Sequence, residues 1–82
     1  MAAVFDDLTS LDDNALAELV RAAIAELSGR GTTASFGALV ALSGEVGAAV
    51  GEAARRVAEQ GSWSQVAEIT GTTKQAAWSR WR

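Results

Sequence analysis

One glycine, Gly71, is the position that most constrains how this chain can fold. It lies between two short segments with helical periodicity, residues 63–69 and residues 73–81. Glycine adopts the left-handed backbone of a tight turn more easily than any residue that carries a Cβ. Ser62 is a suitable N-cap for the first segment, and either Thr72 or Thr73 can cap the second. The sequence therefore predicts two short helices bent around Gly71.

The apolar residues of these two segments indicate how the helices pack. Ala67 lies where they would cross most closely, so a small side chain is needed at that position. Ala77 and Trp81 are four residues apart and should share the inward face of the second helix. The residues expected to face inward are Trp63, Val66, Ala67, Ile69, Ala77 and Trp81.

The rest of the 82-residue chain is expected to be helical as well. There is no proline or tyrosine, and the β-branched residues are scattered, which disfavours strands. A first helix is predicted over residues 11–28, with Ser10 as its N-cap and Gly29 and Gly31 ending it. Phe5 and Leu8 precede this helix and either pack on it or belong to a frayed end.

A polar connection over residues 30–35 leads to a long helix over residues 34–60, which Gly61 ends. Ser43-Gly44 could divide this segment into two helices, so one helix and two helices are both compatible with the sequence. The fold class is thus all-α, with about four helices. Residues 1–60 form a helical support and dimerisation region, residues 61–82 form the two bent helices, and together they make a single compact domain.

Glycines inside the long helix point to close helix packing. Gly37, Gly44 and Gly51 recur every seven residues, and Gly47 lies on the same stripe. Each costs about 1 kcal/mol relative to alanine in a helix interior, whereas a row of small side chains lets a second helix approach closely. The partner is either the same helix of a second subunit, the helix over residues 11–28, or none if the composition alone produced the pattern.

Composition excludes several kinds of chemistry. Without cysteine or histidine the chain has no disulfide, no thiolate metal site and no imidazole catalysis. The acid pairs Asp6-Asp7 and Asp12-Asp13 are adjacent in sequence and do not face each other on a helix. We therefore expect no enzyme, no metal and no cofactor. Because a chain this short buries only about 60% of its unfolded surface, dimerisation is the simplest way to bury more.

Charge is distributed unevenly along the chain. The net charge is −3, but residues 1–52 hold eight acidic and two basic residues, whereas residues 53–82 hold five basic and two acidic residues. A basic C-terminal part on an acidic support is typical of a nucleic-acid-binding end. The chain shows no signal peptide and no long uninterrupted apolar run, and Glu45, Glu52, Arg55 and Arg56 interrupt the long helix. We expect a cytoplasmic protein that does not span a membrane.

The segment GSWSQVAEITGTTKQAAWSRW, residues 61–81, resembles the small helix-turn-helix domains common in actinobacteria and their phages. In that family a long helix precedes Trp-x-x-Ile-Gly/Ala, which is followed by Leu-Gly-Val-Ser/Thr-Arg-Gln-Ala-Ala-x-x-Arg-Trp/Phe. The resemblance implies that Thr73, Lys74, Gln75 and Ser79 face the major groove of DNA. Thr70 and Thr72 depart from the pattern, because they place hydroxyls where apolar side chains usually close the turn.

Helix-turn-helix geometry assigns roles to the polar residues, since the second helix lies in the major groove. Lysine can bond guanine O6 and N7, and glutamine suits adenine N6 and N7. The predicted base-reading residues are Thr73, Lys74, Gln75, Trp78 and Ser79. The predicted phosphate contacts are Ser62, Ser64, Thr72, Arg80 and Arg82. Trp78 lies between the buried and the groove-facing sides of its helix, so a core position, which we favour, and a DNA contact are both open.

Arg55 and Arg56, at the end of the long helix, are also open to two interpretations. Either could contact a phosphate, but pairing with Glu59 and Glu52 at four-residue spacing is favoured.

Three functions fit these features. The preferred one is a sequence-specific DNA-binding protein, a small dimeric transcriptional regulator that binds double-stranded DNA. The alternative is a protein-interaction module on a helix-turn-helix scaffold, such as an antitoxin-like, sigma-binding or adaptor protein. A helical oligomeriser built on the glycine stripe is the third.

Overall fold

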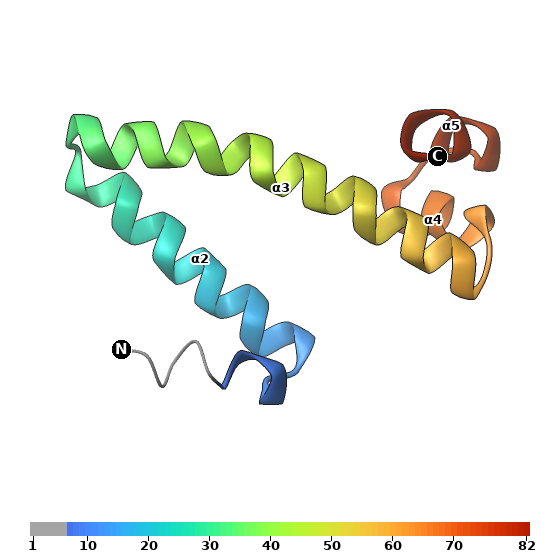
Figure 1. The fold of residues 1–82 in the computed structure, drawn as a ribbon, viewed down its shortest axis with the longest axis horizontal. Helices are drawn as coiled ribbons and strands as arrows, with labels where there is room; N and C mark the ends of the chain where they lie inside the picture. The colour runs from blue at the N-terminus through green and yellow to red at the C-terminus, as the bar shows by residue number, and fades with distance from the viewer. Residues whose placement is uncertain (1–6) are drawn as a thin grey trace. The chain divides into compact units, whose positions relative to one another are not determined.

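The computed structural model describes residues 7–82 and is entirely helical where it is regular (Figure 1). A short 3-10 helix, η1 (Leu8–Ser10), precedes four α-helices. These are α2 (Asp13–Arg30), α3 (Thr33–Gln60), α4 (Trp63–Thr70) and α5 (Lys74–Trp81). Within the described residues there is no strand, so the predicted all-α fold of about four helices is confirmed.

The first long helix, α2, begins two residues later than predicted. Its N-cap is Asp12, whose carboxylate accepts a hydrogen bond of 2.8 Å from the amide of Ala15. Ser10 is not the cap, because its hydroxyl donates to the carbonyl of Asp7 and closes η1. Leu8 is half-buried in η1, and Phe5 lies outside the described residues. At the other end Gly29 stays helical, and Gly31 with φ 62° ends α2.

The connection to α3 is shorter than the predicted residues 30–35, because a reciprocal cap starts α3 immediately. The Ser35 amide donates to Thr32 Oγ1 at 3.0 Å, and the Thr32 amide donates to Ser35 Oγ at 3.1 Å. This is a capping box with serine in the usual place of glutamate or glutamine. Ser35 is 5% exposed and fully hydrogen-bonded, which explains how a polar side chain is buried here.

The helix α3 runs through Ser43-Gly44 without a break, so the one-helix alternative is correct. The chain nevertheless divides within it, into Met1–Ala41 and Leu42–Arg82. We call these the first and second units; the described residues of the first are 7–41. The predicted boundary at residue 60 and the predicted single compact domain stay predictions, but this division falls elsewhere in the chain. The physical reason is that the end of α3 contributes core residues to α4 and α5.

The core of the second unit is small and made almost wholly of alanine. Its buried apolar residues are Ala54 of α3, Val66 and Ala67 of α4, and Ala77 of α5. Ala77 is completely buried, at 0% exposure. Half-buried residues surround this cluster, namely Val57, Ala58, Trp63 and Trp81. The inward positions predicted for Trp63, Val66, Ala67, Ala77 and Trp81 are thus confirmed.

Ile69 was predicted to face inward, and this is wrong. It is 78% exposed and lies at the edge of an apolar groove of about 190 Å³. Val66 and Ala67 already fill the side of α4 that faces α3, so Ile69, two residues beyond Ala67, falls outside that contact.

The glycines of α3 differ in their surroundings. A Cβ added at Gly51 would lie 3.5 Å from both the Trp81 ring and the Arg55 guanidinium, so Gly51 makes room for α5. At Gly37, Gly44 and Gly47 an added Cβ would meet nothing within 4 Å. Within this chain only Gly51 has the close-packing role predicted for the stripe, and a seam at the other three stays a prediction.

Length and composition also make α3 a candidate membrane span. One 18-residue window of this helix has a mean hydropathy of 1.4 with no more than two charged residues. The sequence-based expectation that no segment could cross a membrane is therefore not supported by this test. The core helix of a soluble protein passes the same test when it is mostly buried, whereas 11% of this window is buried here.

The turn at Gly71 generates a stability prediction. Gly71 has φ 69°, so Gly71→Ala should lower the free energy of unfolding by about 1–2 kcal/mol. Gly44 is helical and faces open space, so the control Gly44→Ala should raise it, by up to about 1 kcal/mol. Urea unfolding followed by tryptophan fluorescence measures both, since all three tryptophans lie in the second unit.

Equal effects of the two substitutions would contradict this account of the turn. Destabilisation by Gly44→Ala would mean that Gly44 is packed against another helix in solution.

Candidate nucleic-acid interface

Three residues, Gly71, Thr72 and Thr73, connect α4 to α5 and bend the chain sharply. The amides of Gly71 and Thr72 both donate to the carbonyl of Ala67, the latter at 3.0 Å. A bond from the second residue beyond the helix back to its last turn, with a left-handed glycine between, is a Schellman motif. Backbone geometry, rather than side-chain packing, therefore closes this turn.

The two hydroxyls that depart from the family pattern are accommodated in different ways. Thr70 Oγ1 donates to the carbonyl of Val66 at 2.8 Å, so its polar group is satisfied inside α4. Thr72 is exposed, and its amide rather than its hydroxyl takes part in the turn. Neither residue leaves a buried polar atom without a partner, and the turn holds without the apolar side chains that are usual there.

Side-chain caps define the starts of both helices. Ser62 caps α4 by accepting from the amide of Gln65 at 3.4 Å, and Thr73 caps α5 by accepting from the amide of Ala76 at 3.1 Å. Of the two threonines considered for the second cap, Thr73 is the one. Its oxygen is occupied by this bond, which leaves its hydroxyl hydrogen for another partner.

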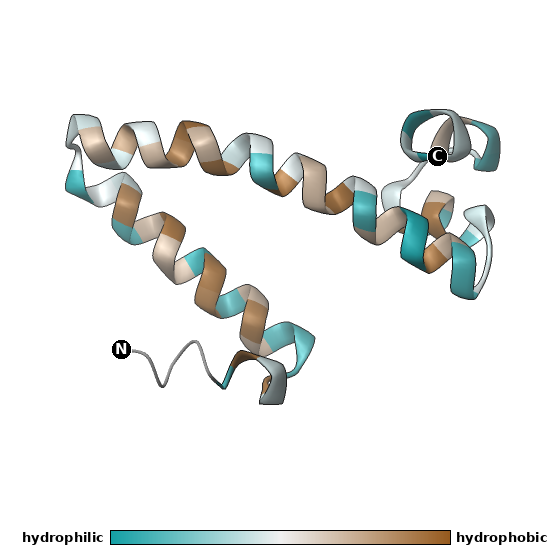
Figure 2. Cartoon of the chain, viewed as in Figure 1, coloured by the Kyte–Doolittle hydropathy of each residue, from teal (hydrophilic) through white to brown (hydrophobic). Residues whose placement is uncertain are grey.

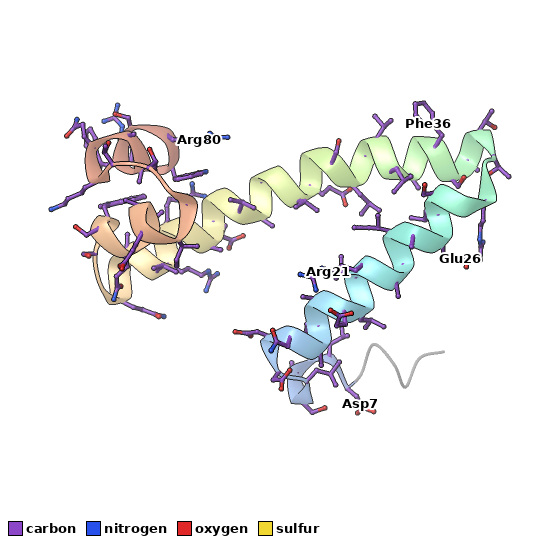
Figure 3. All side chains as sticks on the ribbon, turned by 180° about the vertical axis from the view of Figure 1, so that it is seen from behind. Asp7, Arg21, Glu26, Phe36 and Arg80 are labelled. Carbon is purple, nitrogen blue, oxygen red and sulfur yellow. The ribbon has the colours of Figure 1, made fainter. Side chains whose placement is uncertain are left out.

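The predicted base-reading residues lie together on exposed parts of α5. Gln75 and Ser79 are exposed on the side of α5 away from Ala77, which is completely buried, and Lys74 is exposed in the first turn. Figure 3 shows the labelled Arg80 side chain extending from α5. The helix thus presents a polar surface while an alanine holds it against the core.

Trp78 lies at the surface, so the favoured core position is wrong. It is 39% exposed, and the Arg82 guanidinium covers its ring at 4.3 Å from the ring centroid. It lines an open hollow of about 580 Å³ together with Trp63, Lys74 and Gln75. The reason is its angular position, one residue past Ala77, which turns the ring away from the alanine core. Indole rings, the Lys74 ammonium and the Gln75 amide therefore line the same hollow.

The arginines of this region are not equally available. Arg80 stacks on Trp81 at 5.0 Å, and Arg82 stacks on Trp78, but both side chains remain exposed. Arg80 and Arg82 are thus placed on the surface of α5, as their predicted phosphate contacts require.

Arg55 has a role that the sequence pattern did not reveal. Its guanidinium Nη1 donates to the carbonyl of Trp81 at 3.1 Å, at the C-terminal end of α5. The predicted pair with Glu59 does not occur among the ion pairs of the described residues. Twenty-six positions separate the two partners, so no local spacing rule could have found this bond. Arg55 satisfies a terminal carbonyl and favourably complements the helix dipole.

Arg56 behaves as expected. It pairs with Glu52 at 2.9 Å, and the hydrogen bond and charge of Arg56 lower the pKa of the Glu52 carboxyl. Both side chains are exposed, so this pair is a surface feature of α3 rather than part of the interface.

The predicted phosphate contacts from α4 and the turn lie at helix starts. Ser62 is half-buried by its capping role, while Ser64 and Thr72 are exposed. Free amides at a helix start favour anions. The positions of Ser64 and Thr72 are therefore compatible with the predicted role. Within residues 7–82 no cluster of acidic side chains could hold a metal ion.

Comparison of the chain with protein-family models, with curated proteins and with solved structures finds no match.

The adjacent threonines of the turn provide a matched stability test. Thr73→Ala removes the cap of α5 and should cost about 1 kcal/mol of unfolding free energy. Thr72→Ala removes an exposed hydroxyl outside the cap and should change it by less than about 0.5 kcal/mol. Thermal unfolding followed by circular dichroism compares them. A larger loss for Thr72→Ala would show that the cap is assigned to the wrong residue.

Proposed function

We propose that this protein is a sequence-specific DNA-binding protein, a small transcriptional regulator that reads the major groove with α5. The observation that carries the proposal is that α5 buries Ala77 on one side and exposes Gln75 and Ser79 on the other, with Lys74 exposed in its first turn. A short helix held rigidly at one face, with hydrogen-bonding side chains on the other, is what major-groove recognition requires. The tight turn after α4 supports the same proposal.

Base reading would come from the first turn of α5. Lys74 offers donors to guanine O6 and N7, and Gln75 offers a donor and an acceptor to adenine. Thr73 would add its hydroxyl hydrogen, and Ser79 would extend the contact by one turn. Trp78 supplies the apolar surface that suits a thymine methyl group.

Phosphate contacts would hold the helix in register. Arg80 and Arg82 at the end of α5, with Ser62, Ser64 and Thr72 at the start of α4 and in the turn, are the proposed contacts. Residues 62–82 carry three basic residues and one acidic residue, which favours this end of the chain for a polyanion. The acidic remainder of the chain would be kept away from DNA by repulsion.

One such motif neutralises few phosphates, so tight binding would need two copies of the chain. We include a homodimer in the proposal, because two-fold symmetric proteins bind two half-sites at once. A cytoplasmic location belongs to the same proposal.

A second candidate function is a protein-interaction module. The observations that favour it are the 39% exposure of Trp78 and the 78% exposure of Ile69, the latter beside an apolar groove. Exposed tryptophan is enriched at protein interfaces. These two apolar residues would then be the anchors, and α5 would serve as a scaffold.

The salt dependence of duplex binding tests the first candidate. With about four phosphate contacts in each of the two motifs of the proposed dimer, the association constant should fall about 10⁴-fold between about 50 and 200 mM salt. Fluorescence anisotropy with a labelled duplex pool measures this fall. A flat response would remove the electrostatic contribution on which the proposal depends.

Substitutions on α5 separate the two candidates. On a duplex selected by the wild-type chain, Lys74→Ala and Gln75→Ala should each weaken binding by about 1–3 kcal/mol. Gln60→Ala removes the same amide from the exposed end of α3 and should leave affinity unchanged. Gel-shift titration measures all three.

The protein-interaction candidate predicts that Trp78→Ala, rather than Lys74→Ala or Gln75→Ala, is the damaging substitution. If it alone abolishes function while Lys74→Ala and Gln75→Ala retain it, α5 does not read DNA and a protein partner replaces the duplex.

A further inference from the structure

The described residues of the first unit bury no apolar side chain. Among its described residues, 7–41, the only buried side chain is that of Ser35. All four buried apolar residues of the described chain belong to the second unit. A helix that buries no apolar face gains little from packing, so something else must cover α2 and the start of α3.

The uncovered apolar residues of α2 form one stripe. Leu19, Val20 and Ile24 are 41%, 51% and 40% exposed, and their spacing puts them on one side of the helix. Half-buried Leu16 and Leu27 continue the same stripe toward both ends. Figure 2 shows hydrophobic positions recurring along α2.

Phe36, in the first turn of α3, adds a protruding ring. It is 69% exposed and stands out from the ribbon in Figure 3. Phe36 itself, with Leu27 and Leu39, lines an open hollow of about 300 Å³ where α2 meets α3. In a two-fold assembly the Phe36 rings of two copies can pack against each other over this hollow.

The exposed apolar area supplies part of what a dimer needs. An aromatic side chain carries about 150–250 Å², so Phe36 alone leaves on the order of 150 Å² of apolar surface in water. The three aliphatic residues of the α2 stripe add a comparable area. A standard interface covers about 800 Å² of each partner, and the first unit can supply much of the apolar part of it.

Two helices cannot enclose these residues without help. A helix pair meets along one line and leaves the rest of each apolar stripe in water, whereas two pairs close into a four-helix bundle with a shared core. The smallest closed arrangement therefore takes one helical pair from each of two chains.

Charge argues against a lipid surface as the occupant. Both arginines of the described first unit are already paired, Arg21 with Glu18 at 2.8 Å and Arg30 with Glu26 at 3.0 Å. The remaining charges are acidic, including Asp12 and Asp13, so no basic patch attracts an anionic membrane. The same acidic charges repel a second copy only weakly once salt screens them.

We infer that the first unit is the self-association surface of this protein, in which the α2 stripe and Phe36 of one chain pack against those of a second copy. This assigns a surface to the homodimer in the proposed function, and it is a different surface from the glycine stripe of α3. It does not require that the protein bind DNA.

Sedimentation equilibrium of the full chain without nucleic acid tests the inference. Between about 1 µM and 1 mM the wild type should show a monomer–dimer equilibrium that holds or tightens as salt rises. Ile24→Lys should raise the dimer dissociation constant by about 100-fold or more, because each copy carries the buried charge. The control Ala25→Lys puts the same charge on the opposite face of α2 and should leave the constant unchanged.

A second variant controls for loss of helical structure in the first. Phe36→Ala keeps a strong helix former in α3 and should still weaken the dimer by about tenfold or more, with circular dichroism unchanged. A monomeric wild type, or equal effects of Ile24→Lys and Ala25→Lys, would overturn the inference. So would binding of the monomer to neutral lipid vesicles in place of dimerisation.

These outcomes are distinct from a failure of the proposed function. DNA binding should weaken with salt while self-association does not, so each can fail while the other stands.

Discussion

The close approach of α5 to α3 and α4 is the contact on which the rest of the second unit depends. Three alanines, Ala54, Ala67 and Ala77, and the glycine at position 51 are what allow it. Because the Trp81 ring lies directly against Gly51 and the other contacts are made by alanines, α5 is fixed by the fit of these side chains rather than by a large buried area. A bigger residue at Ala77 would push the helix outward and move every exposed side chain on it.

Hydrogen bonds at both ends of α5 add to the packing of these small residues. The Schellman turn at Gly71 and the Thr73 cap set where α5 starts, and the Arg55 bond to the Trp81 carbonyl holds where it ends. Both ends of an eight-residue helix are thus satisfied, which matters because so short a helix is unstable alone. These hydrogen bonds therefore fix the position of the exposed side chains of α5.

The two units differ in how much apolar surface they bury. In the second unit, tryptophan rings and alanines close a compact core around α4 and α5. In the described first unit, apolar side chains remain exposed to water, so the favourable free energy of burying them is not gained. A second copy of the chain would supply that burial. Recognition and assembly would then belong to separate parts of one chain, each with its own dependence on salt.

Local sequence determined the four α-helices, the left-handed glycines at positions 31 and 71, and the cap at Ser62, because each depends on residues a few positions apart. It also predicted the inward face of α5 through Ala77 and Trp81. Only the tertiary structure decided that Trp78 and Ile69 are exposed and that Gly51 faces Trp81. It also decided that Arg55 donates to the Trp81 carbonyl at the end of α5 instead of pairing with Glu59. These outcomes follow from how three helices cross, and a crossing is set by contacts between distant residues that no helical period encodes.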